Sequence, residues 1–231
     1  MTVSKTTDYW TSRLDGNNPN FPVGMNNEKF AGGNIGQADG LNWRIGNGGA
    51  LGFYHLTPTT DEYTLWISFS YPDASNIPPV GATLALLRNG TDEVLLKSNG
   101  DATSLQLIGA GGLTTMIEGL DLTMSEDDAI PTVIRLTLSS SGIAKAYVYD
   151  IIEDDDGNDL TKTINAYNTN TGSKSISWGN GGGDVKWYAI YATTMGAFNP
   201  DEMVTSNYSN VTLIQTAFGI IDVLKTARSY N

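Results

Sequence analysis

The stretch Tyr63-Thr-Leu-Trp-Ile-Ser-Phe-Ser-Tyr71 alternates between two kinds of side chain. The odd positions, from Tyr63 to Tyr71, carry large apolar groups, whereas the even positions carry small hydroxyl side chains with Trp66 as the exception. Successive side chains of a β-strand point to opposite faces, so a period of two indicates a strand with one face in a core. We predict that this strand lies in the centre of a sheet.

The sequence on either side continues the pattern of short strands separated by turns. Asn89-Gly90 and Asn99-Gly100 are strong hairpin signals, because both residue types tolerate a positive φ. On Val185 to Ala192 we expect Val185, Trp187, Ala189 and Tyr191 to share one face. The further strands are predicted at residues 82–88, 93–97, 104–108, 131–138, 143–150, 160–167 and 185–192. This spacing, without alternating helices, predicts an all-β antiparallel sandwich or barrel.

The two ends of the chain differ from this central part. Residues 1–55 are rich in Gly and Asn turns, and we expect an extended, irregular arm with short edge strands. Residues 56–205 form the predicted sandwich, and 206–231 a short C-terminal helix and tail. In that helix four apolar residues recur at helical spacing, and they face either the sandwich or a partner subunit. They are Ile214, Phe218, Ile221 and Leu224.

Composition excludes several classes of protein. The 231 residues contain 13 Lys and Arg against 25 Asp and Glu, giving a net charge of −12, so nucleic acid and anionic membranes are not expected partners. There is no cysteine and one histidine, His55, which excludes thiolate chemistry and histidine-rich metal sites. The N-terminus lacks the apolar core of a signal peptide, and no apolar run is long enough to span a membrane. We expect no required cofactor.

Three segments resemble a known family. "TVIRLTLSSSGIAKAYVYD" (132–150) looks like paired strands of concanavalin A-like, laminin G-like domains. "GGDVKWYAIYATTMGAFNPDEM" (182–203) resembles the last sandwich strand of that family and the short helix after it, and Tyr63 to Asp73 is similar to the early core strand. The resemblance implies a jelly-roll sandwich of two curved sheets, with a concave face that many relatives use for sugars. It does not imply an activity, because this fold hosts lectins, hydrolases, adhesion modules and viral structural proteins.

A sugar site would need aromatic and polar side chains on one accessible face. Tyr147, Tyr149 and Lys145 share one face of the predicted strand 143–150, and they are our candidates for it. Trp66 and Trp187 are expected in the core instead.

The acidic run that begins at Asp154 is the candidate metal site. A turn with carboxylate and amide oxygens can hold calcium, although Gly157 comes too early for an EF-hand loop. A solvated hairpin tip explains the run equally well, so both interpretations stay open. The candidate calcium ligands are Asp154, Asp156, Asn158 and Asp159.

Three functions fit these observations. The favoured one is a non-enzymatic structural component of a phage or viral particle, as a decoration, fibre or scaffold protein, with copies of itself or other subunits as partners and the virion as its location. In this interpretation the N-terminal arm and the C-terminal helix would contact neighbouring subunits. The alternative is a carbohydrate-binding adhesion or host-recognition module at a cell surface or outside the cell. A glycoside hydrolase fits least, because the paired carboxylates of the related glucanases, Glu-x-Asp-x-x-Glu, do not occur.

Overall fold

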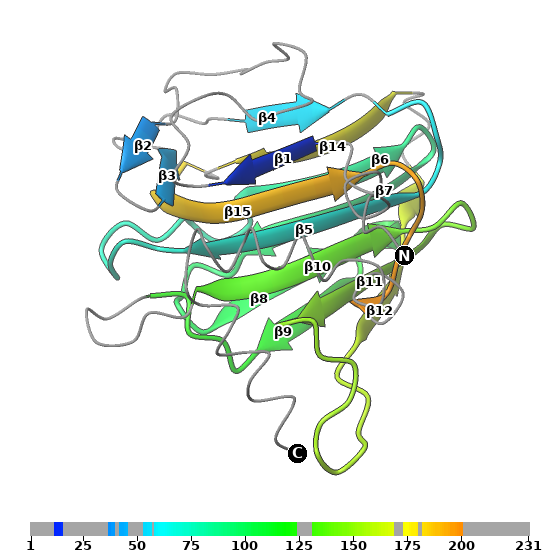
Figure 1. The fold of residues 1–231 in the computed structure, drawn as a ribbon. Coiled ribbons are helices and arrows are strands. Elements are labelled where there is room, and N and C mark those ends of the chain that lie inside the picture. Colours follow the sequence, from blue (N-terminus) through cyan, green and yellow to red (C-terminus); the bar gives the residue numbers. More distant parts are fainter. Residues whose placement is uncertain are drawn as a thin grey trace, which may run out of the picture.

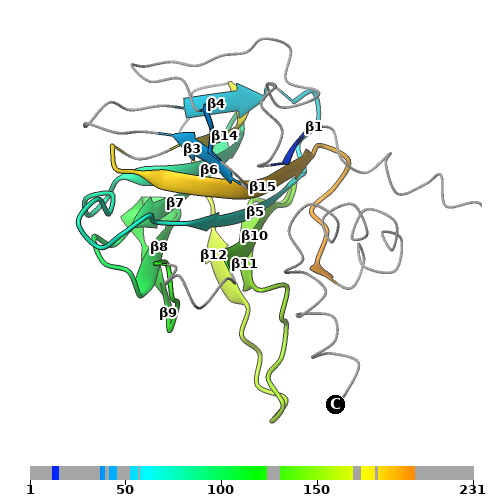
Figure 2. The same cartoon turned by 60° about the vertical axis from the view of Figure 1, so that its left-hand side comes forward.

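The computed structural model is an all-β sandwich of two antiparallel sheets (Figure 1). Figure 2 shows the two layers from a second direction. The structure describes four short strands near the N-terminus and most of the chain after them: residues 12–15, 37–39, 42–45, 53–56, 58–123, 131–168, 173–179 and 182–200.

The first sheet has eight strands, in the order β12-β11-β10-β5-β15-β3-β2, with β1 also paired to β15. Its strands are β1 (Ser12–Asp15), β2 (Gln37–Asp39), β3 (Asn42–Ile45), β5 (Tyr63–Ser70), β10 (Thr132–Leu138), β11 (Ile143–Val148), β12 (Lys162–Asn165) and β15 (Val185–Thr193). Strand β5 lies between β10 and β15, so its predicted central position is confirmed.

The second sheet has seven strands, in the order β4-β14-β6-β7-β8-β9, with β13 also paired to β7. Its strands are β4 (Phe53–Leu56), β6 (Thr83–Asn89), β7 (Asp92–Ser98), β8 (Ser104–Ile108), β9 (Thr114–Glu118), β13 (Tyr167–Asn168) and β14 (Lys174–Gly179). A single 3-10 turn, η1 (Ala110–Gly112), connects β8 to β9. Because β12 and β13 follow each other in the chain but belong to different sheets, this segment joins the two layers at one edge.

The core lies between the two sheets. The face of β5 that runs from Tyr63 to Phe69 is completely buried and packs against the inner side of the second sheet, as its alternation predicts. Trp187 and Trp178 are the largest side chains of the core, and both are wholly buried. The prediction that Trp187 lies in the core is therefore confirmed, whereas Trp66 is buried on the other side of its sheet, outside the core cluster.

Strand β15 departs from strict alternation. The register of β15 against β5 shifts between Trp187 and Ala189, which marks a β-bulge. Val185 and Trp187 are in the core, but beyond the bulge the core positions are Ile190 and Ala192. The expectation that Tyr191 shares a face with Trp187 is therefore wrong, because one extra residue reverses the direction of every later side chain.

Other boundaries also differ from the sequence-based expectations. The predicted strand 143–150 ends at Val148, and the expected border at residues 55 and 56 falls inside β4. Strands β9 and β14 were not predicted, because the segments that form them, TTMIE and KSISWG, are mostly polar. The C-terminal helix, with Ile214, Phe218, Ile221 and Leu224, lies outside the described residues. Within those residues no helix has the length and apolar character needed to cross a membrane.

Candidate functional site

Of the three residues predicted to bind sugar, Lys145 and Tyr147 lie on the outer side of β11, and Tyr149 follows the strand. Lys145 is exposed there, but Tyr147 keeps only 3% of its surface accessible, so the interpretation of Tyr147 as a surface residue is wrong. Tyr149 follows the strand in a tight turn, where it is half-buried. The structure therefore places the trio close together along the chain, but not as an accessible platform.

Tyr147 belongs to a row of large side chains that crosses this sheet. The strand register aligns Tyr191 of β15, Trp66 of β5, Arg135 of β10 and Tyr147 of β11 as direct neighbours. The rings of Trp66 and Tyr191 lie 5.6 Å apart between centroids. Residues directly opposite in antiparallel strands point to the same side, so the four side chains form one continuous band.

A buried ion pair holds the middle of this band. The Arg135 guanidinium donates through Nε to Oδ1 of Asp150 at 2.8 Å and through Nη2 to Oδ2 at 2.9 Å. Trp66 Nε1 also donates to Oδ2 of Asp150, at 2.9 Å. The arginine side chain is 3% exposed and the aspartate 20%, so the charges compensate each other with little help from water.

The turn that carries Asp150 has an unusual backbone. Tyr149 and Asp150 both have a positive φ, 53° and 56°, and the N–H of Ile151 closes the turn onto the carbonyl of Val148 at 3.0 Å. Residues with side chains adopt this conformation at a cost of about 1–2 kcal/mol each. The bonds of Asp150 to Arg135 and Trp66 offset that cost and fix the position of the turn.

The chain after β15 crosses the same side of the sheet. Thr64 of β5 donates its hydroxyl to the carbonyl of Gly196 at 2.9 Å and accepts the N–H of Phe198 at 2.8 Å. Farther along, Arg135 Nη1 donates to the carbonyl of Asn199 at 3.3 Å. Figures 1 and 2 show this segment, in orange, leaving the end of β15 and turning back toward β10 and β11. We call this side the closed face, because its central side chains are at least nine-tenths buried.

The outer side of the seven-stranded sheet is different. Most of its central side chains are half-buried, although Glu93, Ser104 and Ser177 are buried, and they mix aliphatic with polar groups. The register aligns Leu86, Leu95 and Ile108 in one row across β6, β7 and β8, and Thr83, Lys97 and Gln106 in the next. Arg88 forms an ion pair with Glu93 on the other side of the aliphatic row. We call this surface the open face and define it by Thr83, Leu86, Arg88, Leu95, Lys97, Gln106 and Ile108.

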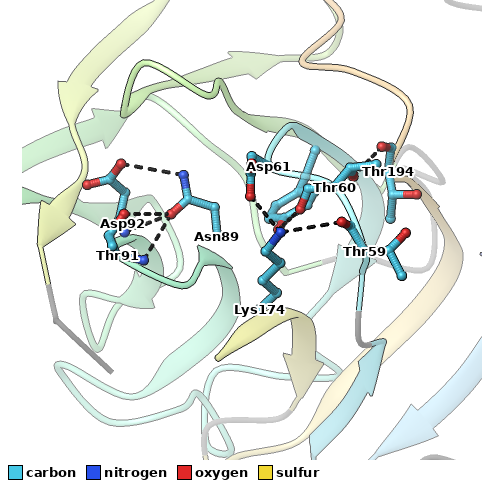
Figure 3. A network of polar contacts seen from close by, with 9 residues as sticks. Thr59, Thr60, Asp61, Asn89, Thr91, Asp92, Lys174 and Thr194 are labelled. Carbon is cyan, nitrogen blue, oxygen red and sulfur yellow. Dashed lines mark hydrogen bonds and ion pairs between the residues drawn. The ribbon is translucent and has the colours of Figure 1, made fainter. Parts of the chain in front are cut away.

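A network of polar contacts lies at one end of the sandwich (Figure 3). Lys174, at the start of β14, pairs with Asp61 Oδ1 at 2.7 Å and donates to the carbonyl of Thr59 at 3.3 Å. The Asn89 side chain accepts the N–H of Asp92 at 2.8 Å and that of Thr91 at 3.2 Å, which fixes the β6–β7 hairpin. These groups bind one another, so the network explains the local fold better than it explains ligand binding.

The candidate calcium residues lie in the hairpin between β11 and β12, which projects from the sandwich (Figures 1 and 2). Oδ1 of Asp154 accepts the N–H of Asp156 at 3.0 Å and that of Asn158 at 2.8 Å, and Oδ2 accepts Asn158 Nδ2 at 2.9 Å. The described residues contain no group of three or more carboxylate, histidine or cysteine side chains arranged to hold a metal. Asp156 and Asp159 are therefore not gathered around Asp154, and calcium binding stays a prediction that needs this loop to rearrange.

Acid titration should detect this turn. The side-chain hydrogen bond from Asn158, with the backbone N–H groups of Asn158 and Asp156, lowers the pKa of Asp154 below its ordinary value. A lowered pKa stabilises the fold at pH values above the unfolded-state pKa, and this contribution is lost as the pH falls through the folded-state pKa. We expect Asn158→Ala to raise the pKa of Asp154 in an NMR titration of the side-chain carboxyls, while Asp73, held in the same way by Ser75, is unchanged. An unchanged Asp154 pKa would contradict the hydrogen-bonded turn.

Comparison with known proteins gives similarity of fold. No family model and no curated protein matches the chain. Among solved structures, an HCR/D mutant aligns with a TM-score of 0.60 at 10% identity, over 89% of this chain and 52% of that one. A structure of botulinum neurotoxin type C, whose cell entry is described as dependent upon interaction with two ganglioside molecules, aligns with a TM-score of 0.52 at 13% identity, over 91% and 54%.

A third match is the binding domain of botulinum neurotoxin DC in complex with rat synaptotagmin II, with a TM-score of 0.50 at 11% identity, over 89% and 54%. The fold is a concanavalin A-like jelly-roll sandwich. The chain spans about half the length of the solved chains that it matches. At these identities the likeness shows the fold alone.

The open face was not predicted from the sequence, although a signal for it was present. In the predicted strands at 82–88, 93–97 and 104–108, the positions between core residues hold both aliphatic and polar side chains. That pattern shows which residues face away from the core, but not how the strands align with one another. Only the register brings Lys97 between Thr83 and Gln106.

Proposed function

We propose that this protein is a non-enzymatic, carbohydrate-binding recognition module that binds its ligand on the open face. One observation carries the proposal: β6, β7 and β8 present mostly half-buried polar and aliphatic side chains outward, whereas the central side chains of the closed face are buried and two of them, Thr64 and Arg135, are bonded to the segment after β15. Ligand sites typically combine an apolar floor with a few placed polar groups. The open face has both.

The arrangement of the open face suits a sugar. The row of Leu86, Leu95 and Ile108 offers an aliphatic floor for the C–H side of a sugar ring. Lys97 and Gln106 beside it can bond to hydroxyl groups, since an ammonium donates and an amide both donates and accepts. Aliphatic side chains take the place that aromatic rings occupy in many sugar sites.

The structural matches support a carbohydrate-binding recognition module over a structural component of a phage or viral particle. Two of the matched structures are described through binding to gangliosides or to a protein receptor. We therefore propose recognition at a host or cell surface as the setting of the function. Recognition of a host or cell surface is also compatible with display of this protein on a particle.

A glycan array probed with the full chain tests the proposal. We expect binding to a defined subset of glycans, reduced at least about tenfold by Leu95→Asn, because a polar amide replaces the centre of the aliphatic floor. Ile143→Asn is the matched control, since Ile143 is also a half-buried strand residue but belongs to the other sheet. Circular dichroism checks that both variants fold. Absence of binding to any glycan, or equal losses in the two variants, would overturn the proposal.

A further inference from the structure

The open face carries a cation that lacks a partner. Lys97 lies near the end of β7 and is half-buried, yet it makes no hydrogen bond or ion pair within the described part of the chain. Glu93 lies on the same face of β7, four residues before Lys97, and in contrast to Lys97 it forms an ion pair with Arg88. The chain has nearly twice as many acidic as basic residues, so an unpaired, half-buried lysine on this face is notable.

From this we infer that the ligand of the open face is an oligosaccharide that bears one acidic sugar, and that Lys97 binds its acid group. The inference rests on the proposed function and adds the chemical class of the ligand. An ammonium in a half-buried position gains most from an anion that also brings hydrogen-bond donors and acceptors with it. A sugar carrying a carboxylate or sulfate has this combination.

The residues on both sides of Lys97 fit such a sugar. Thr83 and Gln106 are its direct cross-strand neighbours, so the three side chains span about 10 Å, roughly the width of one substituted sugar ring. Gln106 donates through Nε2 to Oδ1 of Asn99 at 2.6 Å, which fixes the amide and leaves its carbonyl oxygen as an acceptor. The ligand's acid group would meet Lys97, and its hydroxyls would meet Gln106 and Thr83.

The charge around the face limits how acidic the ligand can be. On the described strands of this sheet the carboxylates are Asp92 and Glu93 on β7, of which Glu93 is paired with Arg88, and Glu118 on the edge strand β9. The protein as a whole carries −12 and repels polyanions at long range. A single acid group therefore fits better than a heavily sulfated chain, whose many charges would meet no matching cations here.

Binding of lactose, sialyllactose and sulfolactose to the full chain, measured by titration calorimetry, tests the inference, with heparin as the polyanionic probe. We expect an acidic trisaccharide or its sulfated analogue to bind about tenfold more tightly than lactose, and heparin to bind no better than lactose. Lys97→Met should abolish this preference and Lys97→Arg should keep it. Lys186→Met is the matched control, because Lys186 is also half-buried, makes no ion pair or hydrogen bond among the described residues, and lies on the eight-stranded sheet.

The outcomes separate the two proposals. Equal affinity for lactose and both acidic sugars, with no effect of Lys97→Met, would overturn the acidic-ligand inference and leave the proposed function standing. Tightest binding to heparin would also overturn it. If none of these sugars binds and the glycan array is blank as well, the proposed function falls and the inference falls with it.

Discussion

Replacing Arg135 with alanine is expected to lower the free energy of unfolding by about 3–5 kcal/mol. The guanidinium is 3% exposed, and it connects three parts of the chain: strand β10, the turn at Asp150 and the crossing segment at Asn199. Without it, the Asp150 carboxylate, which is 20% exposed, loses both of its bonds from the guanidinium and keeps the bond from Trp66 Nε1. A partly buried charge without its partner is costly, and the two positive-φ residues of the turn lose the contacts that offset their strain.

Urea unfolding measures this effect, and a second ion pair provides the control. Lys174→Ala breaks the pair with Asp61, but Lys174 is 30% and Asp61 59% exposed, so we expect a loss of about 1 kcal/mol or less. A double-mutant cycle that adds Asp150→Asn to Arg135→Ala should recover part of the loss, because the neutral amide no longer needs a cation. Equal losses for Arg135→Ala and Lys174→Ala would show that burial of the Arg135 pair does not determine its contribution.

The second large effect is expected at Trp187, in the core. Its side chain is wholly buried, and its ring lies 5.3 Å from that of Phe69 between centroids. Trp187→Ala removes the indole and leaves a cavity between the sheets, which should cost about 3–5 kcal/mol in urea unfolding. The change also removes packing next to the β15 bulge, which starts at this residue.

Phenylalanine at the two tryptophan positions separates packing from hydrogen bonding. Trp187 Nε1 is buried without a hydrogen-bond partner, so Trp187→Phe keeps a ring against Phe69 and loses no hydrogen bond. Trp66→Phe removes the bond from Nε1 to Asp150 and leaves an acceptor less satisfied. We expect Trp187→Phe to cost much less than Trp187→Ala. A loss as large as that of the alanine variant would contradict this account of the site.

The sandwich could be predicted from sequence because its information is local. Alternation on Tyr63 to Tyr71 and turn signals such as Asn89-Gly90 depend on neighbours in the chain, and both predictions hold in the structure. The direction of Tyr191 could not be predicted, because the bulge between Trp187 and Ala189 arises from the pairing of β15 with β5. Likewise, Tyr147 looks like a surface residue on its own strand, and only the neighbouring strands and the crossing segment bury its side of the sheet.

The fold class, the central strand and the acidic character of this protein follow from its amino-acid sequence, because periodicity, turn chemistry and net charge are properties of the chain. Which outer face is open depends on how the strands are assembled in space. That choice depends on strand register, which aligns Lys97 with Thr83 and Gln106, and on the path of the chain after β15, which closes the opposite face over Thr64 and Arg135. Both join residues that are far apart in sequence, so no local pattern records them.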